Sequence, residues 1–153
     1  SYGALGFEIA VNKDTGDVEL LNSVGVYDMG QPLNIEQVHA QIDGAMSMGI
    51  GQAMFEELIT NDSGRMINAN YRDYKVPTAL DMPHNDRWVT DRAGDYLPAG
   101  PYGAKGFGEV ALVPVAPGVS NAIADAIDVR LTRIPVTKER VLMALKEKER
   151  EAK

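Results

Sequence analysis

Two stretches near the start of the chain alternate between apolar and polar residues, a pattern typical of half-buried β-strands. They run from Gly6 to Asn12 and from Asp17 to Asp28, and they flank a short segment that suits a tight reversal. The pattern predicts an antiparallel hairpin. In the second stretch one parity is mostly apolar, so we expect one face of that strand to be buried. This face consists of Val18, Leu20, Asn22, Val24 and Val26.

A long helix is predicted from about Ile35 to Leu58, with Asn34 as its N-cap. Its interior contains glycines, each of which costs about 1 kcal/mol relative to alanine in a helix. One helical face consists of Gln41, Gly44, Met48 and Gly51. Two interpretations of this face stay open: it packs closely against another element of the protein, or it lets a flat ligand approach the backbone.

The second half of the chain predicts shorter elements. They are strands over residues 65–69, 87–90 and 129–134, and helices from Val119 to Ile127 and from about Thr137 onward. A long loop over residues 70–101 carries aromatic side chains, most of which we expect to pack the loop against the protein, although some could line a site. These aromatic residues, with one just beyond the loop, are Tyr71, Tyr74, Trp88, Tyr96 and Tyr102.

Together these elements predict an α+β fold. We expect a two-layer sandwich in which a mixed, largely antiparallel sheet packs with a long glycine-containing helix and shorter helices. Neither an internal repeat nor a linker divides the sequence, so residues 1–153 are expected to form one domain without an internal boundary.

Composition narrows the possible functions. The 153 residues carry a formal net charge of -7, which argues against binding to nucleic acid. No apolar run reaches the roughly 20 residues of a membrane span, and we expect a cytoplasmic protein. Without cysteine the chain holds neither a disulfide nor a thiolate-bound cluster. His39 and His84 lack a second ligand at helical spacing, so we expect no metal bound by side chains of this chain.

The segment from Gly103 to Glu109 is the most informative for chemistry, because it places a carboxylate directly after a glycine-rich turn. Its glycines can adopt positive φ and let the backbone approach a ligand closely. Glu109 also begins an apolar run, Val110–Val113, so it is either a catalytic base or an acid in the first turn of a helix. The spacing around Lys105 lacks the frame of a P-loop, and the third glycine of a dinucleotide-binding fingerprint is missing.

Three blocks of this sequence carry a recognisable pattern. They are the hairpin over residues 6–28 with Gln31–Asn34, the helix blocks Gln41–Gly44, Gly49–Ala53 and Glu56–Glu57, and the segment Gly100–Glu109. Together they resemble the C-terminal part of the molybdopterin-binding subunit of the xanthine dehydrogenase and aldehyde oxidase family, the molybdenum hydroxylases. The resemblance spans nearly the whole chain, and its third block is the most specific.

The resemblance implies roles for a small set of residues. Glu109 is implied to be the general base, and Gln41 is implied to hydrogen-bond the pterin of a molybdopterin-type molybdenum cofactor. Gly106, Phe107 and Gly108 are implied to bring the backbone close to the molybdenum site. The implied reaction is the oxidative hydroxylation of a carbon in an N-heteroaromatic compound, such as a purine or nicotinate-like ring, with water as the source of the oxygen.

The family's other cofactor loop and its substrate-clamping residues have no counterpart in this sequence. The resemblance therefore implies a fragment or a split small subunit, active only with the rest of the molybdenum subunit and with iron–sulfur and flavin (FAD) partner domains or subunits. If the source is bacterial, the cofactor is expected in its cytosine dinucleotide form. Two alternatives stay open: an aldehyde oxidoreductase of the same family, and a non-catalytic assembly domain that keeps the scaffold without the cofactor.

Overall fold

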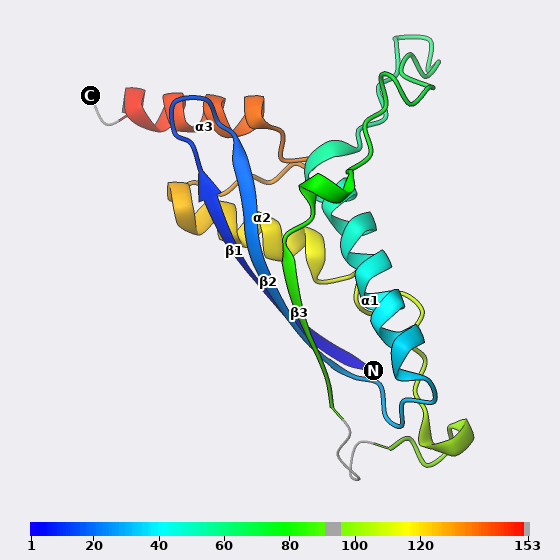
Figure 1. Ribbon diagram of the computed structural model, residues 1–153. Helices are drawn as coiled ribbons and strands as arrows, with labels where there is room; N and C mark the ends of the chain where they lie inside the picture. The colour runs from blue at the N-terminus through cyan, green and yellow to red at the C-terminus, as the bar shows by residue number, and fades with distance from the viewer. Residues whose placement is uncertain (91–95, 152–153) are drawn as a thin grey trace.

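The computed structural model describes residues 1–90 and 96–151, and Figure 1 shows how their elements are arranged. The strands are β1 (Tyr2–Val11), β2 (Val18–Asp28) and β3 (His84–Thr90), and the α-helices are α1 (Ile35–Ile50), α2 (Val115–Ile127) and α3 (Lys138–Glu151). Short helical turns are η1 (Gly51–Phe55), η2 (Ala79–Asp81) and η4 (Pro101–Gly103).

The strands form one sheet in the order β1–β2–β3. β1 and β2 pair antiparallel as the predicted hairpin, and the backbone N–H of Asn12 donates to the carbonyl oxygen of Asp17 at 2.9 Å across its turn. β3 pairs parallel to β2, because the intervening crossover, which contains α1, returns the chain in the same direction. The predicted mixed sheet and the α+β class are therefore confirmed.

Leu21 is an extra residue in β2. Glu8 of β1 pairs with Asn22, but the next residue, Ile9, pairs with Leu20, so Leu21 has no partner in the ladder. Such a β-bulge bends the strand locally and reverses which side chains face the core beyond it.

The bulge divides the face that was predicted to be buried. Val18 and Leu20 pack toward the helices as predicted. Beyond the bulge, the buried side chains have the opposite parity, and Tyr27 is fully buried. Val24 and Val26, at 46% and 43% exposure, lie on the other face of the sheet. The prediction was therefore wrong for this half of the strand.

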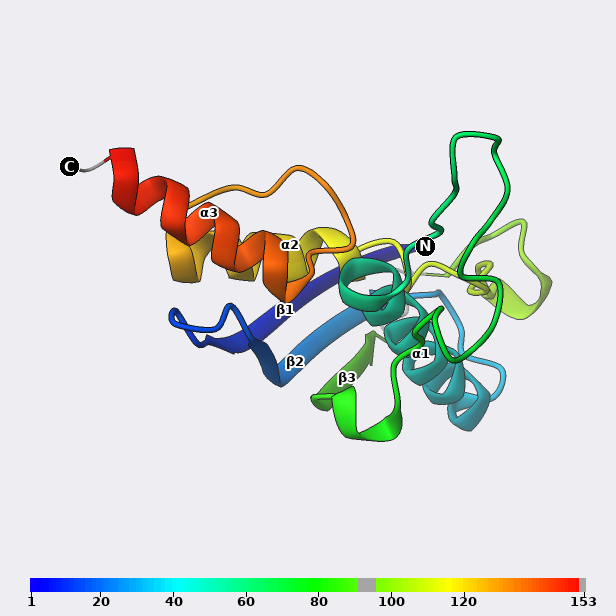
Figure 2. The ribbon, with the colours of Figure 1, turned by 90° about the horizontal axis from the view of Figure 1, so that it is seen from above.

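The α-helices cover one face of the sheet. Figure 2 shows α2 and α3 stacked over one side of β1 and β2, and Figure 1 shows α1 beside β3. Ile123 of α2 and Val141 of α3 share a buried cluster with side chains of the hairpin, and Tyr27 of β2 packs against Ile42 of α1. The opposite face, which carries Val24, Val26 and the 65% exposed Trp88, lies away from these helices.

The helix α1 begins as predicted and ends earlier. The side chain of Asn34 accepts a hydrogen bond from the backbone N–H of Gln37 at 3.1 Å, which confirms the N-cap. After Ile50 the chain continues as a π-helical turn, and at Glu56 it becomes extended. The predicted end at Leu58 was wrong, because this wider turn closes the helix and redirects the chain.

The glycines of this region divide into two kinds. A Cβ on Gly49 would overlap the side chain of Val115 in α2, and one on Gly51 would lie 3.0 Å from Cδ of Pro77. These two glycines permit close packing within the protein, as one interpretation predicted. Gly44 differs, because it is exposed and no atom lies within 4 Å of the place where its Cβ would be.

Two of the predicted strands do not form. Residues 65–69 contribute only the isolated bridge between Thr60 and Met66, and residues 129–134 have no regular structure. Val129 and Leu131 instead pack against the cluster shared by α2 and α3, so this segment lies in the helical layer rather than at the sheet. Across residues 1–90 and 96–151, no helix combines the length and apolar character needed to cross a bilayer.

Candidate active site

The glycine segment, Gly103–Glu109, runs along the turn that follows β2. The carbonyl oxygen of Gly103 accepts a hydrogen bond from the backbone N–H of Gln31 at 3.1 Å, and the N–H of Lys105 donates to the carbonyl oxygen of Met29 at 2.8 Å. Gly103 has a φ of 79°, a left-handed conformation that favours glycine. Positive φ was expected of the segment's glycines, and among them it occurs at Gly103.

A largely buried ion pair reinforces this attachment. Nζ of Lys105 lies 2.5 Å from Oδ2 of Asp28, and the two side chains are only 15% and 17% exposed. The hydrogen bond from Lys105, followed by one from the backbone N–H of Gly30, holds the pKa of the Asp28 carboxyl below its ordinary value. Lys105 is therefore committed to this partner within the chain, which gives further reason to reject a phosphate site around it.

A side chain from α1 meets the other end of the glycine segment. Nε2 of Gln41 donates a hydrogen bond to the carbonyl oxygen of Gly108 at 3.0 Å. Two residues that are 67 positions apart in the sequence thus come together. The bond uses one amide hydrogen of Gln41 and leaves its carboxamide exposed on the surface of α1.

Glu109 does not cap a helix. Its carbonyl oxygen accepts from the N–H of Leu112 at 3.0 Å, which makes a turn, and α2 begins only at Val115. The apolar run after Glu109 is followed by Pro114, which has no N–H and disfavours helical geometry at the residue before it. The helix-cap interpretation was therefore wrong. The Glu109 residue is exposed, at the end of the glycine segment.

The ring of Phe107 anchors the middle of the glycine segment to the core. Its ring meets the ring of Tyr27 edge to face, with 5.7 Å between centroids and 78° between planes. Tyr27 is fully buried against α1, and burial raises the pKa of its phenol. The side chain of Phe107 is thus directed toward the core and is partly buried there.

Three glycines near Gln41 present open backbone. Gly44, Gly106 and Gly108 have no atom within 4 Å of the place of a Cβ, and none of them has a positive φ. Neither packing within the described residues nor local conformation therefore requires glycine at these positions. Open backbone beside an exposed carboxamide fits a flat, polar ligand such as a pterin, and the residues present are compatible with such a group.

Beside this surface lies a small cavity of about 190 Å³. Its lining includes Gln37 and Gln41 from α1, and Lys105 and Phe107 from the glycine segment. The lining mixes amide and apolar side chains, which suits a ligand with a planar apolar body and polar edges.

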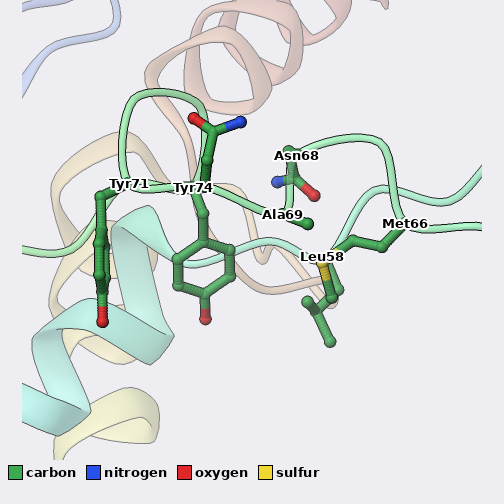
Figure 3. A pocket seen from close by; sticks show the side chains of 7 residues that line it. Leu58, Met66, Asn68, Ala69, Tyr71 and Tyr74 are labelled. Atoms are coloured by element: carbon green, nitrogen blue, oxygen red, sulfur yellow. The ribbon is translucent and has the colours of Figure 1, made fainter.

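A larger cavity, of about 430 Å³, lies beneath the loop that follows η1 (Figure 3). Tyr71 and Tyr74 line one side of it, and Leu58 and Met66 line the other. The buried amide of Asn68 is occupied, since its Nδ2 donates to the carbonyl oxygen of Glu57 at 2.7 Å and its Oδ1 accepts from the N–H of Ile59 at 3.0 Å. This cavity has no connection to the glycine segment.

The expectation that most aromatic loop residues pack the loop down was wrong. Tyr71, Tyr102 and Trp88 are mainly exposed, and Tyr96 is partly so. Only Tyr74 is largely covered, where its hydroxyl donates to Glu56 at 2.6 Å, a bond that raises the pKa of the tyrosine. Among the residues that the structure describes, no cluster of three or more His, Asp or Glu side chains could hold a metal ion.

Residues 1–83 match the family described as the molybdopterin cofactor-binding domain, which is more than half of the 153 residues. The chain belongs to this family. The chain is 35% identical, over 92% of its length, to the 6-hydroxypseudooxynicotine dehydrogenase complex subunit gamma of Paenarthrobacter nicotinovorans. It is 36% identical, over 94% of its length, to the probable hypoxanthine oxidase XdhD of Escherichia coli (strain K12).

The chain spans 18% and 15% of the lengths of these two relatives. A solved structure, quinoline 2-oxidoreductase from Pseudomonas putida 86, superposes on 91% of this chain with a TM-score of 0.85 and 30% identity, and the match covers 18% of the solved chain. The names of all three relatives are those of oxidoreductases. The predicted family is confirmed, and this chain corresponds to a small part of each of these proteins.

Sequence reasoning missed Asp28 and Tyr27, which support the glycine segment of this molybdopterin cofactor-binding domain. One signal could have revealed Asp28. A lysine inside a tight, glycine-rich segment is costly to bury without a carboxylate partner, and Asp28 ends the strand before the turn that meets the segment. Nothing in the sequence pairs Tyr27 with Phe107, because the bulge at Leu21 decides which face Tyr27 occupies.

Proposed function

We propose that this chain forms one wall of the active site of a molybdenum hydroxylase that oxidatively hydroxylates a carbon of an N-heteroaromatic compound, such as a purine or nicotinate-like ring. The hydrogen bond from Gln41 to Gly108 carries the proposal, because it joins the proposed cofactor contact to the residue before the proposed base. Membership in the molybdopterin cofactor-binding domain family supports the cofactor, and the names of the relatives support an oxidoreductase.

A molybdenum cofactor, when bound, would supply the two-electron oxidant, with water as the source of the oxygen. The carboxamide of Gln41 would hydrogen-bond the pterin, while its bond to Gly108 keeps the side chain in place. Gly106 and Gly108 would lie against the cofactor through their backbone, since neither carries a side chain that would hold it away. Phe107 would hold this backbone down through its ring in the core.

Glu109 would act as the general base. Its carboxylate would accept the proton that a water-derived nucleophile gives up as it attacks the ring carbon. Glu109 is exposed at the end of an anchored segment, so its carboxylate can meet a substrate held by other parts of the enzyme. The residues that clamp and select the substrate are proposed to lie outside this chain, as are the iron–sulfur and flavin groups that carry the electrons onward.

We propose that residues 1–153 act as one domain within an assembled enzyme that includes the remainder of the molybdenum subunit and its electron-transfer partners. The cofactor is proposed to be the cytosine dinucleotide form in a bacterial enzyme. The chain spans only a small part of the length of its relatives, which supports its dependence on the rest of the enzyme. Most of a complete subunit would come from outside this chain.

The test is Glu109→Gln in the assembled enzyme. The substitution keeps the size of the side chain and removes its ability to take a proton, so kcat should fall by about 100-fold or more while the molybdenum content stays unchanged. Glu147→Gln, an exposed glutamate on α3, is the matched control and should leave both quantities unchanged. Wild-type turnover by fully loaded Glu109→Gln would refute the role of the base.

The substrate class needs a separate comparison. Hypoxanthine and quinoline represent N-heteroaromatic rings, and benzaldehyde represents the aldehyde alternative, each with an artificial electron acceptor. The proposal expects the largest kcat/KM for one of the rings. A preference for benzaldehyde would favour the aldehyde oxidoreductase, and an assembled wild-type complex without molybdenum would favour the assembly domain.

A further inference from the structure

The ion pair between Asp28 and Lys105 lies at the start of the glycine segment, and the proposed base lies at its end. We propose that Asp28 and Lys105 are positioning residues that fix the glycine segment, and with it Glu109, relative to α1. This inference rests on the proposed function of Glu109. It concerns residues that take no part in the chemistry itself.

Asp28 has both of its carboxylate oxygens engaged. Oδ1 accepts from the backbone N–H of Gly30 at 3.0 Å, and Oδ2 accepts from Nζ of Lys105 at 2.5 Å. The ammonium of Lys105 also lies 5.9 Å from the centroid of the Tyr2 ring, over the end of β1. One carboxylate thus ties the turn after β2 and the glycine segment to the same end of the sheet.

The segment has few other attachments between Lys105 and Glu109. Gly106 and Gly108 have open space around them and cannot anchor through side chains. What remains is the Phe107 ring against Tyr27, the bond from Gln41 to the carbonyl oxygen of Gly108, and a hydrogen bond from Oγ of Ser1 to the carbonyl oxygen of Gly106. At the start of the segment the ion pair adds to the backbone hydrogen bonds of Gly103 with Gln31 and of Lys105 with Met29, and Gln41 holds the other end. Loss of the ion pair therefore removes the charged side-chain anchor at the start of the segment.

A second lysine–aspartate pair provides a matched control. Nζ of Lys148 lies 2.9 Å from Oδ2 of Asp128, where α3 meets the end of α2. This pair has the same chemistry but no contact with the glycine segment. Asp128 has a φ of 53°, a left-handed conformation that asparagine also adopts readily, so Asp128→Asn should be tolerated.

The first measurement does not depend on turnover. In the assembled enzyme, Asp28→Asn should leave the oxygen that accepts from Gly30 but remove the charge that holds Lys105. Hydrogen exchange of peptides covering residues 103–109 should become about tenfold faster or more, because one anchor of the segment is lost. Asp128→Asn should leave that exchange rate unchanged. Equal exchange in Asp28→Asn and wild type would overturn the proposal.

The second measurement separates positioning from general stability. Per bound molybdenum, kcat of Asp28→Asn should fall by about tenfold or more with KM changed little, because small displacements of a catalytic group are costly. A purely structural pair would lower the molybdenum content and leave kcat per molybdenum unchanged. Lys105→Met is the second variant, and it should show the same faster exchange and the same lower kcat per bound molybdenum. It keeps the proposal testable if Asp28→Asn fails to assemble.

The double variant Asp28→Asn/Glu109→Gln connects the two proposals and keeps them distinct. If Asp28 acts through Glu109, the double variant should be no slower than Glu109→Gln alone. Additive losses would overturn the positioning role. If Glu109→Gln itself turns over like wild type, the proposed function fails, while the exchange measurement still decides whether the ion pair holds the segment.

Discussion

Replacing Gly44 by alanine should stabilise this chain and weaken its hold on the cofactor. Gly44 lies in the interior of α1 and is exposed, with no atom within 4 Å of the place of a Cβ. The added methyl group therefore meets no clash, and alanine is favoured over glycine in a helix by about 1 kcal/mol. This gain corresponds to a folding equilibrium constant about fivefold larger and to a Tm about 2–4 °C higher.

Urea-induced unfolding, followed by circular dichroism, measures the free energy of unfolding of Gly44→Ala, and metal analysis of the assembled enzyme measures its molybdenum content. Gly49→Ala is the control from the same helix. There the Cβ would overlap Val115, so stability should fall by about 1–3 kcal/mol. Lower stability of Gly44→Ala would show that the position is not open. Higher stability with full molybdenum content and turnover would refute the reasoning that this face meets the cofactor.

Three further predictions concern the scaffold. Gly25→Ala should destabilise the protein by about 1–3 kcal/mol, because its Cβ would lie 2.6 Å from side-chain atoms of Tyr27. A thermal melt should show a lower Tm, and an unchanged Tm would contradict that packing. Asn34→Ala should cost about 1 kcal/mol in urea unfolding, since it removes the N-cap, and Asn34→Asp should retain most of the stability. The hydrogen bond from Arg140 lowers the pKa of Glu57 from its ordinary value of 4.5, so the stability it contributes is present above that value and is lost as pH falls through the folded-state pKa. The free energy of unfolding, measured from neutral to acidic pH, should decline less steeply in Glu57→Gln than in the wild type. An equal decline in the two proteins would contradict this assignment.

Local rules in the sequence gave several elements correctly. The turn between β1 and β2 and the cap at Asn34 depend on residues within a few positions of one another, and both formed as predicted. The last helix also begins beside its predicted first residue, where Oγ1 of Thr137 accepts from the backbone N–H of Arg140 at 3.4 Å. Short-range hydrogen bonds of this kind can be inferred from residue type and spacing alone.

Features that depend on distant partners could not be predicted in this way. The extra residue at Leu21 is decided by pairing with β1, so period-two alternation gave the wrong face beyond it. The apolar run after Glu109 is compatible with a helix, so a helix start was predicted there. In the structure α2 begins only at Val115, after Pro114. Residues 129–134 have strand-like composition, yet they pack in the helical layer, where no ladder is available.

The candidate site shows the same division. Glu109 was predicted as a candidate base from its place after the glycine-rich turn, and Gln41 was placed on the glycine face of the helix by spacing, while their specific roles came from the resemblance. No spacing rule indicates that an amide on α1 would reach the carbonyl oxygen of Gly108. The structure supplied that contact and the partner of Lys105. The open space around Gly106 likewise could not be predicted. The sequence does not distinguish a glycine required by a turn from one required by a closely packed neighbour.

The extra residue at Leu21 lets one alternating sequence in β2 place apolar side chains on both faces of the sheet. Before it, the apolar positions of the strand are turned toward the helices, and after it Val24 and Val26 are turned away from them. A map of tolerated substitutions along β2 should therefore keep a period of two but change phase at Leu21. Deleting that single residue should remove the change of phase and leave both surfaces in place: Leu20 and Tyr27 would stay inward and Val26 outward, now in one unbroken alternation.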